Sequence, residues 1–277
     1  MIFLPKSLFK LVTTRGSDVL VLLKEAIHSK SFLNCILSRL IVKGFKETDY
    51  IISTSDSQID FLKNQGIDNG KLHLIKTGVD IQRIHDQSTN EKIATKSDKF
   101  IFSARYISKV YNMEYQLEAI KALPCNILDE YSFLFVKKVG DDSGFYQSFR
   151  SALNEIPNLR YDIVEGLSQN QMWATLKASS LTYMVPKSDG TPNTALECMA
   201  AEVPFIMGNI DYNKELFENV CLISDLSSPK DFVSKIEEAL DDYPKALLKR
   251  AGEIVSKYGN REIEMKKLEK IYNRLGA

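Results

Sequence analysis

Residues 181–201, LTYMVPKSDGTPNTALECMAA, combine an apolar run, a polar turn and a stretch of helix-forming residues. The apolar run, Leu181–Val185, predicts a buried strand, and the segment 195–201 predicts a helix. Asp189 therefore lies in a strand-to-helix turn, and Glu197 follows in the first turns of the helix. Free backbone N–H groups at a helix N-terminus suit a phosphate, and a carboxylate can accept hydrogen bonds from two sugar hydroxyls. The turn thus has the groups needed to hold a sugar nucleotide.

The rest of the chain alternates short apolar runs with amphipathic stretches, a pattern typical of parallel sheets flanked by helices. The predicted strands are residues 10–13, 50–53, 72–76, 100–103, 132–136, 159–163, 181–185, 204–207 and 221–223. The predicted helices are residues 19–28, 32–46, 56–65, 113–123, 144–155, 169–177, 194–201, 214–218, 229–239 and 261–275. The fold class is therefore α/β with Rossmann-like parallel sheets.

The pattern divides into domains. Residues 1–85 predict a first Rossmann-like domain, and residues 99–260 predict a second one. Between them, residues 86–98 are rich in Ser, Thr, Asn, Lys and Glu, which is typical of a linker. Residues 261–277 follow as a last helix with one apolar face.

Composition is that of an ordinary globular protein, with 44% hydrophobic and 26% charged residues. The net charge of zero gives no reason to expect a nucleic-acid partner. Residues 1–85 carry 12 Lys and Arg against 8 Asp and Glu, a net charge of 12 − 8 = +4. This bias favours an anionic membrane surface, although an ordinary fluctuation of surface charge explains it equally well.

Several signatures are missing. The four cysteines contain no C-x-x-C pair, which argues against a zinc site or a disulfide framework and fits cytosolic residence. The three histidines are dispersed, and no Asp-x-Asp tripeptide, Walker A sequence or G-x-G-x-x-G fingerprint occurs. No signal peptide is evident, and the apolar runs are too short to span a bilayer.

The sequence SDGTPNTALECMAAEVP, residues 188–204, resembles the acidic-x7-Glu motif of family 4 of the retaining glycosyltransferases, which have the GT-B fold. The usual motif begins with Glu, whereas this chain has the shorter Asp189. The resemblance implies that the second domain binds a nucleotide sugar. It also implies that the helix after residue 260 crosses back to the first domain.

Two further segments resemble passages of the family. Ser103-Ala104-Arg105, with Lys109 downstream, resembles the passage whose Arg and Lys clamp the donor diphosphate, although Lys109 stands one or two residues early. Residues 13–18 resemble the segment at the cleft edge of the first domain, with Arg15 and Asp18 toward the acceptor. A solvated arginine and a helix-capping Asp explain residues 13–18 equally well.

The resemblance assigns the candidate site residues. The catalytic candidates are Asp189, Arg105 and Lys109. The donor-binding candidates are Glu197, Gly190, Thr191, Pro192, Asn193, Arg105, Val164, Glu165 and Gly140. The acceptor-side candidates are Arg15, Gly16 and Asp18. Trp173, the single tryptophan, is expected to be a packing residue rather than a stacking platform.

The first domain is expected to be partial, while the second is expected to be complete. In the family, several β/α units precede the segment around Arg15, whereas Met1 stands only 14 residues before it. A truncated or split gene, a short form completed by a partner chain and a wrongly chosen start codon each explain this.

The resemblance implies a transferase that moves a hexose from a UDP- or GDP-linked donor to a saccharide or lipid-linked acceptor, with retention. It implies surface polysaccharide biosynthesis, a nucleotide-sugar co-substrate and no metal or other cofactor. The expected location is the cytoplasm, with peripheral contact at the inner face of the membrane. Two alternatives stay open, a catalytically impaired nucleotide-sugar-binding or regulatory module and a sugar-nucleotide epimerase.

Overall fold

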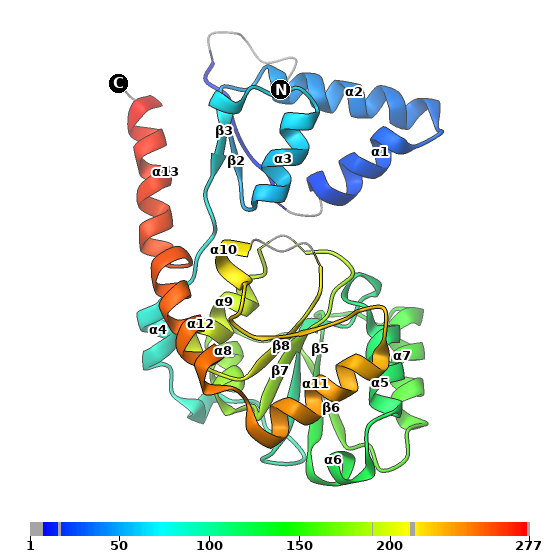
Figure 1. Ribbon diagram of the computed structural model, residues 1–277. Helices are drawn as coiled ribbons and strands as arrows, with labels where there is room; N and C mark the ends of the chain where they lie inside the picture. Colours follow the sequence, from blue (N-terminus) through cyan, green and yellow to red (C-terminus); the bar gives the residue numbers. More distant parts are fainter. Residues whose placement is uncertain (1–7, 16–17, 190, 211–213, 276–277) are drawn as a thin grey trace.

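The computed structural model describes residues 8–15, 18–189, 191–210 and 214–275 (Figure 1). The chain forms two lobes, and each is built on a sheet whose strands all run parallel. The predicted α/β class with parallel, Rossmann-like sheets is therefore confirmed. We call the two parts the N-terminal lobe, residues 8–80 together with 261–275, and the C-terminal lobe, residues 81–260.

The N-terminal lobe has a three-stranded sheet in the order β1-β2-β3. Its strands are β1 (Leu11–Thr13), β2 (Tyr50–Ser53) and β3 (Leu72–Leu74). Its helices are the π-helix η1 (Asp18–Leu23), α1 (Lys24–His28), α2 (Phe32–Lys46), α3 (Asp56–Asn64), the 3-10 turn η2 (Asn69–Lys71) and α13 (Arg261–Leu275). Val19, Phe45 and Leu62 form one core with the sheet, whereas Ile271 of α13 packs with Ile52 and Ile75 in another. Helix α13 therefore covers part of the N-terminal sheet.

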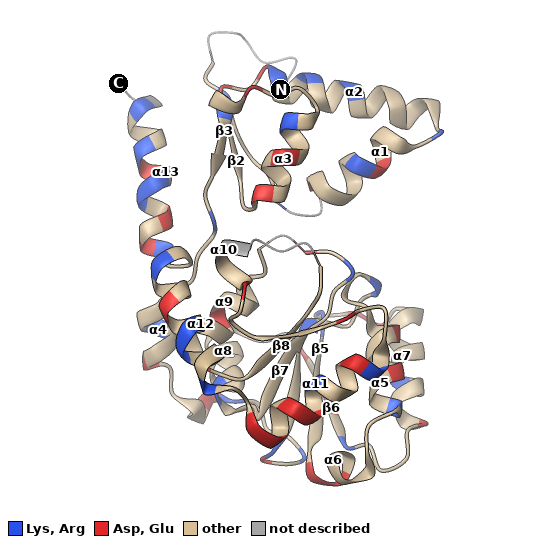
Figure 2. Ribbon diagram, viewed as in Figure 1, with Lys and Arg blue, Asp and Glu red and all other residues tan. Residues whose placement is uncertain are grey.

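The α1–α2 hairpin extends from this lobe with much of its apolar surface exposed (Figure 1). Only Ser38, Gly44 and Phe45 of α2 are buried among the described residues. Figure 2 shows basic residues along α2 and no acidic ones.

The C-terminal lobe has a six-stranded sheet in the order β6-β5-β4-β7-β8-β9. Its strands are β4 (Phe100–Tyr106), β5 (Ser132–Lys137), β6 (Tyr161–Glu165), β7 (Leu181–Met184), β8 (Phe205–Gly208) and β9 (Leu222–Ser224). Sequence order reverses between β4 and β7, and α/β folds bind their ligands at such a switch point, beyond the carboxyl ends of the strands.

Helices cover both faces of this sheet and enclose two apolar cores. The helices are α4 (Ile81–Asp86), α5 (Met113–Lys121), α6 (Cys125–Glu130), α7 (Gly144–Asn154), α8 (Gln169–Ala178), α9 (Asn193–Ala201), α10 (Lys214–Phe217), α11 (Pro229–Asp242) and α12 (Lys245–Tyr258). The 3-10 turns are η3 (Thr89–Glu91) and η4 (Lys109–Tyr111). Helices α5, α6, α7 and α11 supply one core, whereas α4, α8, α9, α10 and α12 supply the other.

The two lobes are joined by two crossings of the chain that lie side by side. The Val79 N–H donates to the Gly259 carbonyl at 2.8 Å, and the Arg261 N–H donates to the Val79 carbonyl at 3.0 Å. Gly78 has a φ of +66°, and a Cβ atom there would lie 2.6 Å from the Arg261 Cα. The close approach of the two crossings thus requires glycine at position 78.

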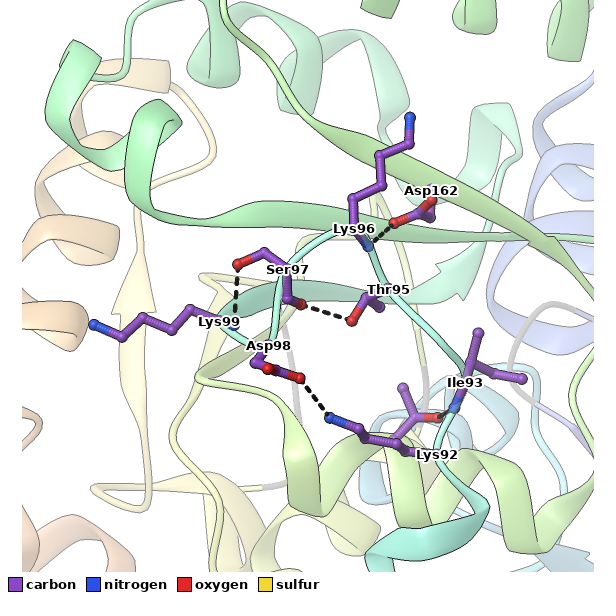
Figure 3. Close-up of polar contacts among 9 residues, drawn as sticks. Lys92, Ile93, Thr95, Lys96, Ser97, Asp98, Lys99 and Asp162 are labelled. Carbon is purple, nitrogen blue, oxygen red and sulfur yellow. Dashed lines mark hydrogen bonds and ion pairs between the residues drawn. The ribbon is translucent and has the colours of Figure 1, made fainter.

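Residues 86–98, predicted as a linker, lie along the C-terminal lobe instead of spanning the two lobes (Figure 3). The Ile93 N–H donates to Thr175 Oγ1 at 3.3 Å, and the Lys96 N–H donates to Asp162 Oδ2 at 2.8 Å. Polar composition predicts a loop, but it does not reveal that these polar groups find partners on one lobe.

Helices α4, α6 and α12 have no counterpart in the helices predicted from sequence. The first two are six residues long, too short to show a helical period. Helix α12 buries Ala251 and Val255, and its Leu247, Leu248, Ile254 and Tyr258 pack partly buried against the two cores. These differences concern the outer layer, and all the predicted strands are present with shifts of a few residues at their ends.

Candidate functional site

A cleft of about 460 Å³ lies between the two lobes. It is lined by Thr13, Arg15, Ile52, Thr54, Ile75, Lys76 and Thr77 of the N-terminal lobe, Met265 and Leu268 of α13, and Arg105, Tyr111, Asp189, Thr191, Pro192 and Asn193 of the C-terminal lobe. Most of these residues follow the carboxyl ends of β1, β2, β3, β4 and β7, because parallel strands present those ends at one edge of a sheet.

The cleft brings together many of the residues predicted from the sequence. Those that line it are Arg15, Arg105, Asp189, Thr191, Pro192 and Asn193. Arg15 belongs to the N-terminal lobe, and the others belong to the C-terminal lobe. Gly16 and Gly190, also predicted, lie outside the described residues.

Arg105 and Asp189 form an ion pair in the cleft. Their side chains are only 18% and 20% exposed, so the pair is mostly shielded from water. The Tyr111 ring lies against the guanidinium, with its centroid 5.3 Å from Arg105 Cζ. Within the described residues Arg105 Nε is buried and has no hydrogen-bond partner. The guanidinium thus retains a donor, and guanidinium donors match phosphate oxygens well.

The turn after β7 also touches the N-terminal lobe. Thr191 Oγ1 donates to the Thr54 carbonyl oxygen at 2.6 Å, which joins the two lobes across the cleft. Among the residues that the structure describes, no side chain caps the N-terminus of α9, where Pro192 occupies the N-cap position. The Asn193 side-chain oxygen is buried and has no hydrogen-bond partner among the described residues.

Glu197 lies on α9, outside the lining of the cleft, and is 8% exposed. Its Oε1 accepts hydrogen bonds from Trp173 Nε1 at 3.0 Å and from Gln169 Nε2 at 2.7 Å. Burial raises the pKa of Glu197, because the charged carboxylate loses water, whereas these two N–H bonds and the charge of Arg105 act in the opposite direction.

Three predicted donor-binding residues lie away from this cleft, Val164 and Glu165 at the end of β6 and Gly140 in the turn after β5. The Gly140 N–H donates to Glu165 Oε1 at 2.6 Å, and Lys137 Nζ lies 3.2 Å from Glu165 Oε2. The Gly140 N–H and then Lys137 lower the pKa of Glu165 by stabilising its charge. Val164 pairs with Val136 in the ladder between β5 and β6. None of these residues lines the cleft, and the donor-binding role of Gly140, Val164 and Glu165 stays a prediction.

Two other predicted residues also lie outside the cleft lining. Lys109 Nζ is 5.8 Å from the centroid of the Phe145 ring on α7. The Asp18 carboxylate accepts the Arg15 N–H, at 2.9 Å from each oxygen. Asp18 thus bonds the chain before η1, and the catalytic role of Lys109 and the acceptor-side role of Asp18 stay predictions.

Sequence reasoning missed several residues of the site. Thr54, Lys76 and Tyr111 line the cleft without having been assigned to it. Gln169 and Trp173 are bonded to Glu197, whereas only packing was expected of Trp173. Their spacing of four residues on a helix was a signal, since it places them on one face.

A family model described as "Glycosyl transferases group 1" matches residues 84–257, which is more than half of the chain. No curated protein matches the sequence.

Solved structures are similar in fold. Sucrose-phosphate synthase from Thermosynechococcus elongatus has a TM-score of 0.74 at 16% identity, covering 96% of this chain and 67% of that one. Anabaena HepE, in complex with UDP and glucose, has a TM-score of 0.75 at 12% identity, covering 96% and 72%. A UDP-forming trehalose-phosphate synthase from Burkholderia xenovorans, in complex with glucose-6-phosphate, has a TM-score of 0.71 at 14% identity, covering 86% and 64%. The chain thus spans about two thirds of the length of these proteins.

Proposed function

Because the chain belongs to the glycosyl transferases group 1 family, we propose that it transfers a sugar from a nucleotide diphosphate to an acceptor hydroxyl. The observation that carries the proposal is the cleft, in which Arg105, Asp189 and the start of α9 face the N-terminal lobe. These groups offer a cation for the diphosphate, a carboxylate for the sugar and free backbone N–H groups for a phosphate.

On the donor side, Arg105 binds the diphosphate and Asp189 orients the donor sugar. The ion pair between them means that the incoming diphosphate competes with Asp189 for the guanidinium. When the bond to the sugar breaks, negative charge grows on the departing diphosphate. Arg105 and the N-terminus of α9 stabilise that charge in a cleft partly shielded from water. We therefore propose that the reaction needs no metal ion.

Glu197 is proposed to accept hydrogen bonds from the ribose of the donor. It lies on α9, in the same strand–turn–helix unit as Asp189 and Thr191, and the resemblance of this unit to the donor-binding motif of the family supports the assignment. A carboxylate accepts two vicinal hydroxyls well.

We propose a hexose as the transferred sugar, retention of configuration, and a saccharide or lipid-linked acceptor in surface polysaccharide biosynthesis. The motif from Asp189 to Glu197 supports retention through its resemblance to retaining enzymes. The similar structures support a UDP-linked donor and a sugar acceptor, because one of them holds UDP and glucose and another holds glucose-6-phosphate. The acceptor faces Arg15 and Thr13 of the N-terminal lobe.

We also propose that the protein acts in the cytoplasm and touches the membrane through the α1–α2 hairpin. Phe32 and Leu33 at the start of α2 are 78% and 76% exposed. Residues 26–46 carry Lys and Arg but no Asp or Glu (Figure 2). An exposed apolar edge flanked by basic residues suits the surface of an anionic bilayer. In the described part of the chain, no helix has the length and apolar character needed to cross a membrane.

Sedimentation with vesicles tests the membrane contact. The protein is expected to pellet with vesicles containing phosphatidylglycerol and to remain in solution with pure phosphatidylcholine. The double variant Phe32→Glu, Leu33→Glu should lose binding without loss of thermal stability, since both side chains are exposed. Equal binding by the parent and this variant would contradict the proposal.

Calorimetric titration with UDP, GDP and their glucose derivatives, in EDTA, tests the donor site. Metal-free binding that is lost in Glu197→Ala supports the proposal, and binding without sugar transfer to any acceptor would favour the nucleotide-sugar-binding module. Failure of every nucleotide to bind the parent would contradict both.

A further inference from the structure

Glu197 is held by two N–H groups from a single helix. Trp173 Nε1 and Gln169 Nε2 both donate to the same atom, Glu197 Oε1, at 3.0 and 2.7 Å. Gln169 and Trp173 are four residues apart on α8, so they lie on one face of that helix and point at α9 together. Within the described residues, no hydrogen bond or ion pair involves the other oxygen, Oε2.

The indole of Trp173 is itself fixed in place. Trp173 is 2% exposed and belongs to one of the two cores of the C-terminal lobe. Arg83 of α4 lies against it, with Cζ 5.3 Å from the ring centroid, and donates to Asn170 Oδ1 at 3.3 Å. A ring packed in this way cannot turn, so its N–H has one fixed direction, toward Glu197.

We propose that Trp173 and Gln169 are positioning residues of the donor site, which hold Oε1 of Glu197 so that Oε2 accepts the ribose hydroxyls of the nucleotide. The inference rests on the proposed function, in which Glu197 binds the ribose. A carboxylate that is already held in one rotamer loses little freedom when the ligand binds, so more of the interaction energy appears as affinity.

The test compares two nucleotides that differ only in the groups Glu197 would hold. Calorimetry measures the Kd of UDP and of 2′,3′-dideoxy-UDP, or of the GDP pair if the parent prefers GDP. Trp173→Phe keeps the aromatic packing and removes the N–H, while Gln169→Met removes the second donor at a residue outside the core. Each variant should weaken UDP binding about tenfold, the order expected for a lost bond to a charged group.

Neither variant should weaken binding of the dideoxy nucleotide, because that ligand has no ribose hydroxyls for Glu197 to hold. In a Glu197→Ala background, the two variants should have no further effect on UDP. Gln147→Met, at an exposed glutamine on α7 away from Glu197, is the matched control for Gln169→Met and should bind UDP as the parent does.

The pH dependence of UDP binding gives a readout that simple loss of packing would not change. The bond from Trp173 lowers the pKa of Glu197, so its removal raises that pKa. The acid limb of UDP binding should therefore move to higher pH in Trp173→Phe.

The outcomes distinguish failure of the donor site from failure of the positioning role. If the parent binds no nucleotide, or if Glu197→Ala binds UDP as the parent does, the proposed role of Glu197 fails and this inference fails with it. If Glu197→Ala loses UDP while Trp173→Phe and Gln169→Met bind it normally, the donor site stands and the positioning role is overturned. Equal weakening with UDP and the dideoxy nucleotide would also overturn it, since general damage to the site would then be the cause.

Discussion

Arg105 and Asp189 are 84 residues apart in the chain, yet they form an ion pair in the lining of the cleft. They meet because β4 pairs directly with β7, which aligns Phe102 with Thr182 and brings the ends of both strands together. The same pairing places Arg105, which is proposed to bind the diphosphate, beside Asp189, which is proposed to orient the sugar.

Replacing Arg105 should remove most of the affinity for the diphosphate. In Arg105→Ala the cleft loses the cation that faces Asp189, and Asp189 is left to repel the incoming phosphates. A loss of about 10- to 100-fold in UDP affinity is expected, the order for hydrogen bonds to a charged group. Calorimetry measures the loss, with exposed Arg150→Ala on α7 as the control. Parent-like affinity in Arg105→Ala would contradict the assignment.

The buried Glu197 should make stability depend on pH. Burial raises its pKa in the folded protein, so the folded state keeps a proton that the unfolded chain releases. The stability from this group is complete below the ordinary glutamate pKa of about 4.3 and is lost as pH rises through the raised value.

In Glu197→Gln this loss should disappear. The unfolding free energy of the variant relative to the parent should therefore increase as pH rises from about 4.3 toward neutrality. Urea unfolding across this pH range measures the difference, and Glu253→Gln on the exposed side of α12 gives the baseline. If the difference in unfolding free energy between Glu197→Gln and the parent does not change with pH, Glu197 has the same pKa in the folded and the unfolded protein, and the prediction is wrong.

Substitution of Gly78 should destabilise the junction of the lobes. An alanine Cβ there would lie 2.6 Å from the Arg261 Cα, and the φ of +66° is itself unfavourable for alanine. We expect Gly78→Ala to cost at least about 1 kcal/mol. Gly144→Ala is the control, because a Cβ at Gly144 meets nothing within 4 Å. Thermal unfolding of the two variants measures the contrast, and equal melting temperatures would refute it.

Loss of the Thr191 hydroxyl should open the cleft. Thr191→Val removes the hydrogen bond to the Thr54 carbonyl, whereas Thr191→Ser keeps a hydroxyl in place. A bond of this kind contributes about 1 kcal/mol, so the ratio of closed to open molecules should fall several-fold. Small-angle scattering should give a larger radius of gyration for Thr191→Val than for Thr191→Ser. Identical curves would show that the bond does not hold the lobes together.

Much of the architecture was open to prediction from the sequence. Strand β2 and helix α2 have the predicted bounds, because apolar periodicity and flanking turn residues are local properties of the chain. The position of residues 86–98 could not be predicted in the same way. The segment lies along the C-terminal lobe because its backbone N–H groups donate to Thr175 and Asp162, which are distant in sequence.

The sequence alone determined the strand–turn–helix unit that carries Asp189 and Glu197, because every residue of that unit lies within a few positions of the next. The surroundings of that unit depend on contacts between elements that are distant in the chain. The order of the strands places Arg105 beside Asp189. The packing of α8 on α9 lets the buried Trp173 donate a hydrogen bond to Glu197. The physical reason is that local periodicity sets which side of an element is apolar, whereas the partners across a sheet or between helices depend on contacts between distant parts of the chain.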